Sequence, residues 1–373
     1  MANAAEGQPD QDAEEAVLDE STDADEALPQ ALPPYEITSY GIDFDVVGLV
    51  GRLERGDIDV PSFQRKFVWT PRQCARFVES LLLGLPVPGV FLYSEPKTRR
   101  LVVIDGQQRL KTLLAFYRGE LDGKAFRLPV NEPSRYQQFH PAFEGKMIGD
   151  LLEEDRRRLD STIIHATVVR QDAPENDLTS VYHIFERINS TGTKLTAQEI
   201  RSAVYGGPLS DLLRQLNRQP AWREIFGPES KRLKDQELVL RFIALLYELE
   251  SYARPMTDFL NSFMGRHQSL EDLNANEISR VFDDTMVLLT RSLGRRAIRP
   301  AGPLNAAVFD AVAVGLARRV LRGPVTDLDG LKQAHIALLA RPDFWEWAGR
   351  ATSDDASVTG RVQAAIDLFA EIP

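Results

Sequence analysis

The sequence has little of the residues that build covalent cross-links or metal sites. Its 373 residues include one cysteine, Cys74, and five histidines. A single cysteine excludes an internal disulfide and fits a reducing cytoplasm. Because Cys74 lies next to Phe77 and Val78 on a predicted helix, we expect a packed thiol rather than a nucleophile. The histidines are scattered without metal-ligand spacing, so a zinc site is not expected.

Long apolar runs and the standard phosphate-binding motif are also missing. No run approaches the length of a membrane span, and no basic segment followed by an apolar one opens the sequence. We therefore expect a cytoplasmic protein without a membrane partner. The pattern Gly-x-x-x-x-Gly-Lys-Ser/Thr does not occur, which excludes a standard P-loop. The hydrophobic fraction of 43% and the charged fraction of 27% are ordinary for a globular protein.

Basic residues are missing from the first 34 positions, which carry ten acidic residues. This segment accounts for −10 of the formal net charge of −11, so the other 339 residues sum to about −1. It is poor in large apolar residues and ends in prolines, which predicts a disordered acidic tail over residues 1–35. A tail that mimics DNA and shields a basic surface is an alternative. The near-neutral remainder argues against indiscriminate DNA coating but leaves room for a local basic patch.

The remaining sequence divides into a mixed part and a helical part. Residues 36–175 are predicted to form a small α/β domain with strands near 58–60, 90–93, 101–104 and 163–169. Residues 176–373 are predicted to be almost wholly helical, with apolar repeats in Leu238–Leu249, Ile278–Leu293, Asn305–Leu321 and Leu331–Leu339 and a last helix over Ser357–Phe369. The expected fold class is therefore α+β, a small α/β domain followed by an all-helical half.

The most informative segment is Leu101–Leu110, which reads LVVIDGQQRL. Its first four residues predict a buried strand, and an Asp-Gly turn follows. Apolar residues then recur at helical spacing from Leu110 to Tyr117. A strand that turns sharply into a helix leaves the first backbone N–H groups unpaired. Together with the helix dipole, those groups attract anions.

The polar residues of this junction suit a phosphate group. Gly106 allows close approach of the backbone, and Asp105 could hold a divalent metal ion or orient a water molecule. Further donors and positive charge come from Gln107, Gln108, Arg109 and Lys111. The alternative is an ordinary strand–turn–helix junction with solvated polar side chains, since short motifs carry false-positive risk.

A second polar cluster lies upstream, where Gln64 and Arg65 stand among aromatic residues in VPSFQRKFVW. An amphipathic helix ended by Gly84 and Pro86 follows. The strand Val90–Tyr93 is then expected to form a hairpin with the run before Asp105. This arrangement predicts that Gln64 and Arg65 form the opposite wall of a pocket. Alone, they would be surface groups.

Two later motifs have readings from physical chemistry. In FERINSTGTKLTAQEIR, residues 185–201, Thr196 and Glu199 form a predicted capping box and are expected to be structural. Arg187 and Asn189, at a helix end, could complete phosphate or base contacts or simply be solvated. In KDQELVLRF, residues 234–242, a buried Arg241 would need a phosphate or carboxylate partner, and an ion pair with a carboxylate such as Asp235 is favoured.

These three motifs, together with PSFQRKFVW and GLPVPGVFLY, resemble the N-terminal domain family of GmrSD-type restriction endonucleases over roughly residues 36–265. The resemblance implies a fold similar to the ParB and sulfiredoxin nucleotide-binding domains, with Asp-Gly-Gln-Gln-Arg as its signature. It also implies nucleoside triphosphate binding and hydrolysis, coupled to a DNA nuclease in bacterial defence against phage. The family's His-Asn-His nuclease pattern is not found in the C-terminal half of the sequence. The chain therefore resembles either the nucleotide-sensing subunit of a split system, with the nuclease as a separate partner subunit, or a stand-alone relative.

We therefore expect a triphosphatase that regulates a restriction system, with Mg²⁺ as the accompanying cation. Phosphates would lie on the amino end of the helix near Gln108, Arg65 and Arg109 would neutralise charge, and Asp105 would hold Mg²⁺ or align water. Gln107 or Gln108 would position the attacking water. The alternatives are a nucleotide- or DNA-sensing module without turnover and, less favoured, a metal-dependent nuclease. The base preference and the oligomeric state stay open.

Overall fold

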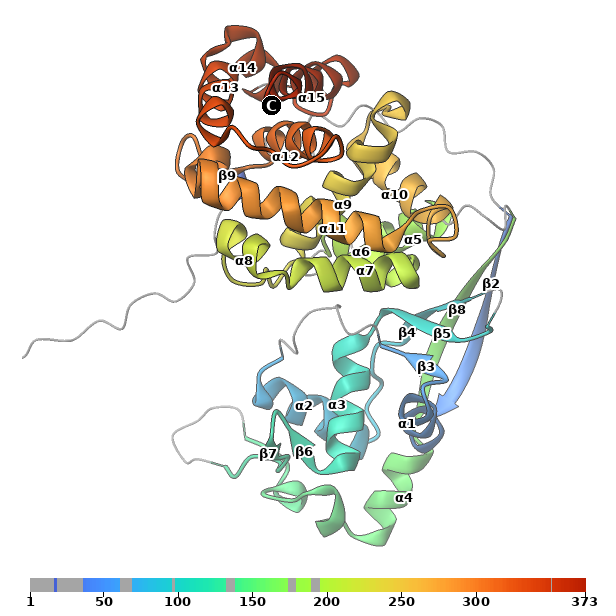
Figure 1. The fold of residues 1–373 in the computed structure, drawn as a ribbon. Helices are drawn as coiled ribbons and strands as arrows, with labels where there is room; N and C mark the ends of the chain where they lie inside the picture. Colours follow the sequence, from blue (N-terminus) through green and yellow to red (C-terminus); the bar gives the residue numbers. More distant parts are fainter. Residues whose placement is uncertain are drawn as a thin grey trace, which may run out of the picture. The chain divides into compact units, whose positions relative to one another are not determined.

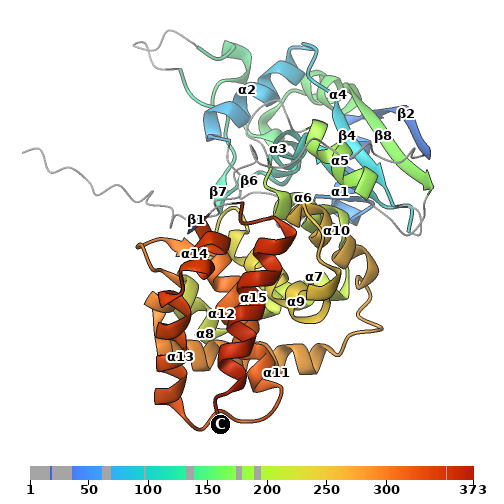
Figure 2. The same cartoon turned by 90° about the horizontal axis from the view of Figure 1, so that it is seen from above.

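The computed structural model describes residues 17–18, 36–60, 69–95, 98–131, 138–173, 179–188, 195–349 and 351–373. The contacts divide the chain into two compact units (Figures 1 and 2). Residues 33–204 form one, here called the sheet unit, and residues 205–373 with the first 32 residues form the other, the helical unit. Helices α5 and α6 group with the sheet unit in this division, and the domain boundary predicted near residue 175 stays a prediction.

The sheet unit is built on a five-stranded mixed sheet with the order β2-β8-β4-β5-β3. Its strands are β2 (Glu36–Asp45), β3 (Ile58–Asp59), β4 (Val90–Ser94), β5 (Leu101–Asp105) and β8 (Ile163–Ala173). Strands β4 and β5 form the predicted antiparallel hairpin, β8 runs parallel to β4, and β3 runs parallel to β5. The predicted mixed α/β character of this part is confirmed.

Strand β2 was not predicted from the sequence. It pairs antiparallel with β8 along its whole length and is an edge strand. Its side chains are exposed except at Ile42 and Phe44. Only the second half of EITSYGIDFD, from Tyr40 to Asp45, alternates apolar and polar residues as a half-buried strand does, which is a short signal for a ten-residue strand.

The helices of the sheet unit pack their apolar stripes against this sheet and one another. They are α1 (Val46–Arg55), α2 (Pro71–Leu82), α3 (Gln107–Arg118), α4 (Glu153–Ser161), α5 (Thr179–Ile188) and α6 (Ala197–Val204). Short elements lie between α3 and α4, namely β6 (Glu120–Leu121), β7 (Lys124–Ala125), η1 (Pro141–Phe143) and η2 (Ile148–Asp150). Leu49, Val78, Val103 and Leu113 are fully buried in the common core.

Helix α2 begins with a local capping motif. Thr70 caps its amino end in a capping box with Gln73, and Pro71 occupies the first turn. Cys74 is fully buried on the core side, and burial raises the pKa of its thiol. The prediction of a packed thiol is confirmed.

The helical unit contains α7 (Pro208–Asn217), α8 (Pro220–Phe226), α9 (Lys234–Glu248), α10 (Met256–Arg266), α11 (Ala275–Leu288), α12 (Ala306–Val320), α13 (Leu328–Ala340), α14 (Pro342–Gly349) and α15 (Asp355–Ala370). Short helices η3 (Leu249–Ser251), η4 (Leu289–Leu293) and η5 (Arg295–Ile298) connect some of them. The four predicted apolar repeats and the predicted last helix coincide with observed helices, except that the repeat over Asn305–Leu321 extends one residue beyond α12 at each end. Helix α12 is central and packs against α9, α11 and α15.

The packing of α12 against α15 depends on a small residue. A β-carbon at Gly315 would lie 2.9 Å from atoms of Ala365 and Phe369, so the two helices approach closely there.

Among the described residues, no helix combines the length and apolar character that a membrane crossing requires. Within the segment predicted to be a disordered tail, Val17–Leu18 forms β1, which pairs in parallel with β9 (Leu304–Asn305).

Gly89, just before β4, is a position where the sheet tolerates no side chain. A β-carbon there would lie 2.6 Å from the backbone oxygen of His165 on β8. We expect Gly89→Ala to destabilise the sheet unit by about 1–3 kcal/mol, because the two strands must separate to admit the methyl group. Urea denaturation should show a lower midpoint. Gly149→Ala is the control, since a β-carbon there meets nothing within 4 Å. Equal midpoints for the two variants would contradict this account.

Candidate functional site

The candidate site is the junction at which β5 ends and α3 begins. Asp105 is the last residue of β5, and Gly106 takes the N-cap position of α3 with φ of 100°. A β-carbon at Gly106 would lie 2.5 Å from Cγ1 of Val90, so both conformation and space require glycine. Because glycine has no side chain, no N-cap side chain accepts a hydrogen bond from the backbone N–H groups at the amino end of α3. The predicted strand–turn–helix geometry is confirmed.

Arg109 links this junction to the loop before β4. Its Nη2 donates to Oδ2 of Asp105 at 2.7 Å and to the backbone oxygen of Gly89 at 2.9 Å. The Arg109 side chain is 17% exposed, whereas that of Asp105 is 45% exposed. Arg109 therefore acts as an internal clamp. Its Nε is buried and has no hydrogen-bond partner within the described ranges.

The neighbouring side chains bring further polar groups to the same helix turn. Oε1 of Gln108 accepts a hydrogen bond from the backbone N–H of Trp69 at 3.2 Å, which ties α3 to the start of α2. Lys111 is half-buried, and loss of solvent lowers the pKa of its ammonium group. Asp105, Gly106, Gln107, Gln108, Arg109 and Lys111 thus follow one another from the end of β5 into the first two turns of α3, where successive side chains point to different sides of the helix.

Sequence reasoning did not assign Trp69 and Gly89 to the site, although they are anchors of this turn. The Trp69 ring packs edge-on against Phe77 with centroids 5.6 Å apart, which fixes the residue whose N–H meets Gln108. Both residues act through backbone atoms, and a backbone donor or acceptor has no sequence signature. The glycine directly before a buried strand was the one available signal for Gly89.

Three predicted site residues, Gln64, Arg65 and Asn189, lie outside the described residues. The predicted opposite wall of the pocket therefore stays a prediction. Arg187 is exposed on the last turn of α5, and α5 packs against β5, the strand that ends at Asp105. Its role in ligand contacts stays a prediction as well.

The donor set suits a cation that arrives with a ligand better than one held by the protein alone. Among the described residues, no group of three His, Cys, Asp or Glu side chains is placed to hold a metal ion. Asp105 supplies one carboxylate, and its Oδ2 is already engaged by Arg109. Mg²⁺ is commonly bound by one or two carboxylates together with phosphates and water, so Asp105 could complete such a shell.

The second motif is structural at the two positions predicted to be so. The backbone N–H of Thr196 donates to Oε2 of Glu199 at 2.6 Å, and the N–H of Glu199 donates to Oγ1 of Thr196 at 3.2 Å. This is the reciprocal pattern of a capping box, and the prediction is confirmed.

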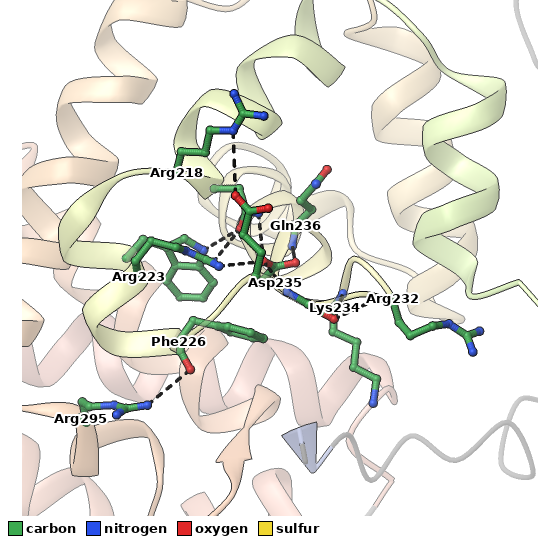
Figure 3. Close-up of polar contacts among 12 residues, drawn as sticks. Arg218, Arg223, Phe226, Arg232, Lys234, Asp235, Gln236 and Arg295 are labelled. Carbon is green, nitrogen blue, oxygen red and sulfur yellow. Dashed lines mark hydrogen bonds and ion pairs between the residues drawn. The ribbon is translucent and has the colours of Figure 1, made fainter. Parts of the chain in front are cut away.

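The third motif lies in the helical unit, where both of its buried charges have protein partners. Oδ2 of Asp235 accepts from Nδ2 of Asn217 and Nη1 of Arg223, each at 2.9 Å, and from the N–H of Ser230 at 3.1 Å (Figure 3). Asp235 is fully buried. Its role is to organise the loop before α9 and the start of that helix.

Arg241 pairs with a carboxylate, as predicted, but not with Asp235. Its Nε and Nη2 donate to the two oxygens of Asp310 at 3.1 Å and 2.5 Å, and Nη2 of Arg361 also donates to Asp310 at 3.1 Å. The suggested partner Asp235 was wrong because it stands six positions earlier on α9. At about 100° per residue, side chains six apart point to different sides of a helix.

One known family matches part of the chain. Residues 47–206 match the family model described as the GmrSD restriction endonuclease, N-terminal domain. The matched range contains the β5–α3 junction and the second motif, whereas the third motif lies beyond it. No curated protein matches the chain. Over the matched range, the chain is thus similar to a domain of restriction enzymes.

Removing the Arg109 clamp should loosen the junction. We expect Arg109→Ala to destabilise the sheet unit by about 1.5–3 kcal/mol, because a charged hydrogen bond is lost and the Gly89 carbonyl loses its donor. The stability of Arg109→Lys should lie between those of the wild type and Arg109→Ala, since a single ammonium group is a poor donor to two acceptors at once. Hydrogen exchange of peptides covering β4, β5 and α3 measures the change.

Arg157→Ala is the matched control for Arg109, because Arg157 pairs with Glu153 while both side chains are more than 70% exposed. Exposed pairs contribute little to stability. Exchange rates in the junction that are the same for Arg109→Ala and Arg157→Ala would contradict a clamp.

Asp235→Asn should destabilise the helical unit by about 1–3 kcal/mol, because an amide replaces the charge that faces Arg223 and turns one acceptor atom into a donor. Urea denaturation of the full chain provides the measurement. Asp211→Asn is the control, since Asp211 is exposed and pairs with Arg214 at the surface. A midpoint unchanged by Asp235→Asn would show that this carboxylate is free for another role.

Proposed function

We propose that the chain is a nucleoside triphosphate-binding and -hydrolysing regulator of a bacterial DNA restriction system that acts in the cytoplasm. The observation that carries the proposal is the amino end of α3, where no side chain caps the helix and Gln107, Gln108, Arg109 and Lys111 occupy the first turns. Such an end favours anionic groups through its N–H groups and dipole. The match of residues 47–206 to a restriction endonuclease domain supports the same conclusion. We also propose that the fold of the sheet unit is similar to that of ParB and sulfiredoxin nucleotide-binding domains.

In this proposal the phosphates lie against Gly106 and the first turn of α3. Lys111 and Arg109 neutralise phosphate charge, and Gln107 or Gln108 positions the attacking water. Asp105 completes the shell of a Mg²⁺ ion carried by the triphosphate, and this ion lowers the charge repulsion of the phosphates. Phosphoryl transfer requires mainly positioning and charge neutralisation, which these side chain types can supply. Gln64, Arg65, Arg187 and Asn189 are proposed to contribute the remaining ligand contacts.

One observation favours a second candidate, a nucleotide sensor without turnover. The carboxylate of Asp105 and the guanidinium of Arg109 are paired at 2.7 Å, so the two groups best suited to the reaction hold each other. Binding could then shift the helical unit between two arrangements that DNA or a separate His-Asn-His nuclease subunit recognises. Turnover would require the pair to separate when the ligand arrives.

Gln107→Glu separates ligand binding from stability. A carboxylate in the first turn of α3 suits the helix dipole, so the fold should keep its stability or gain slightly. The same charge should repel phosphates and weaken binding of a Mg²⁺–triphosphate at least tenfold, about 1.4 kcal/mol. Thermal shift titrations and phosphate release with ATP and GTP measure both effects.

Asn276→Asp serves as the control, because it adds the same charge to the first turn of the exposed amino end of α11. It should leave triphosphate binding unchanged. Binding by the wild type without phosphate release would favour the sensor. A wild-type chain whose melting temperature no triphosphate raises would refute the proposal in both forms.

A further inference from the structure

The two faces of the five-stranded sheet are covered to different extents. Helices α1, α2, α3 and α4 cover the first face, where their apolar residues share a core with Leu92, Val103 and Val168. Successive side chains of a strand point to opposite faces, so Phe91 and Thr167 belong to the second face. This second face is covered over only part of its area, and the remainder lies next to the candidate site.

Helix α5 covers the inner part of the second face. It packs against β5, and its Val181 and Phe185 are fully buried outside the core of the first face. The strand residues of this part, Tyr93, Val102 and Val169, form one row across β4, β5 and β8 and are at most 6% exposed. The second face is therefore closed to a ligand at this row.

The next row of the same face is open. The strand register places Asp105, Phe91 and Thr167 side by side on β5, β4 and β8, and all three residues are partly exposed. Neighbouring strands lie about 4.8 Å apart, so the row extends about 10 Å across the sheet from Asp105. We call the surface formed by Phe91 and Thr167 the shelf.

The far end of the shelf is bounded by the ring of His165. Gly41 of β2 is paired with Thr167, and a β-carbon at Gly41 would lie 2.7 Å from Cε1 of His165, so the ring lies over this glycine. Nδ1 of His165 is hydrogen-bonded to Oδ1 of Asp43, also on β2, at 2.8 Å. The ring is therefore turned toward β2 and away from Phe91.

The shelf is continuous with the amino end of α3. Asp105 belongs to the open row and directly precedes Gly106, the N-cap residue of α3. A ligand whose phosphates lie against this helix end can therefore extend over Phe91 toward Thr167. An aromatic ring beside a hydroxyl group suits a nucleoside, because bases stack on aromatic side chains and polar groups of the base or sugar hydrogen-bond to a hydroxyl.

We propose that the nucleoside part of the triphosphate lies on the shelf, with its base against Phe91 and a polar group of the base or sugar hydrogen-bonded to Thr167. This inference rests on the proposed function, since it takes the phosphates to lie at the amino end of α3. It adds that the shelf selects nucleotides over a plain phosphate chain. Every base can stack on an aromatic ring, so the shelf distinguishes nucleotides from other phosphates more than one base from another.

Binding of two ligands to the full chain tests the proposal. Isothermal titration calorimetry in the presence of Mg²⁺ gives the dissociation constants of a non-hydrolysable ATP analogue and of inorganic tripolyphosphate, which has no nucleoside. Phe91→Ala should weaken binding of the ATP analogue relative to tripolyphosphate about fivefold or more, because a stacking contact is lost. A change in the folded population affects both ligands equally, so it cancels from the ratio of the two constants.

Two further variants make the test specific to the ring and to its face of the sheet. Phe91→Leu keeps an apolar side chain without the aromatic ring, so it should lose most of the same selectivity. Tyr40→Ala is the matched control, since Tyr40 is an exposed aromatic residue that pairs with Val168 on the first face. It should leave the ratio unchanged.

The possible failures can be told apart. A ratio that Phe91→Ala leaves unchanged, while both ligands still bind, would refute the shelf and leave the triphosphate site standing. A wild-type chain that binds neither ligand would refute the triphosphate site and the shelf with it.

Discussion

The sheet unit depends on one sharp backbone reversal at Gly106. The strand β5 can pass directly into α3 only because this residue adopts a left-handed conformation and has no side chain to meet Val90. Arg109 then fixes the reversal by joining Asp105 at the end of the strand to the Gly89 carbonyl on the neighbouring loop. The same constraint creates the open amino end of α3. The side chains of Asp105 and Arg109 that stabilise the reversal are therefore the same ones that the proposed chemistry would use.

The helical unit contains several buried charged side chains. Asp310, on a helix buried on almost every side, is surrounded by the guanidinium groups of Arg241 and Arg361. Asp235 is held by Asn217, Arg223 and a backbone N–H. Because a buried ion that loses its partner is costly, these groups fix how α9, α12 and α15 meet. The charged residues of the third motif thus have a structural explanation.

The sequence predicted most of what depends on apolar periodicity and on local capping rules. The β4–β5 hairpin, the helices of the C-terminal half, the buried Cys74 and the Thr196 capping box all follow from neighbours within a few positions. Strand β2 was not predicted because its apolar alternation is short and its partner β8 lies more than 100 residues away in the sequence. The Asp310 partner of Arg241 and the Gly89 partner of Arg109 are also distant in sequence. Long-range partners of polar groups depend on the packing of whole elements, which local patterns do not encode.

The burial of helix α12 has a consequence for the folding of the chain during its synthesis. Fourteen of its fifteen residues are buried, so in isolation it would present apolar surface in every direction. Much of its cover comes from α15, which begins 35 positions after α12 ends and is therefore synthesised later. While the ribosome is still making residues 321–370, this surface is without its last layer. A nascent chain that stalls in that interval would be a substrate for chaperones and prone to aggregate.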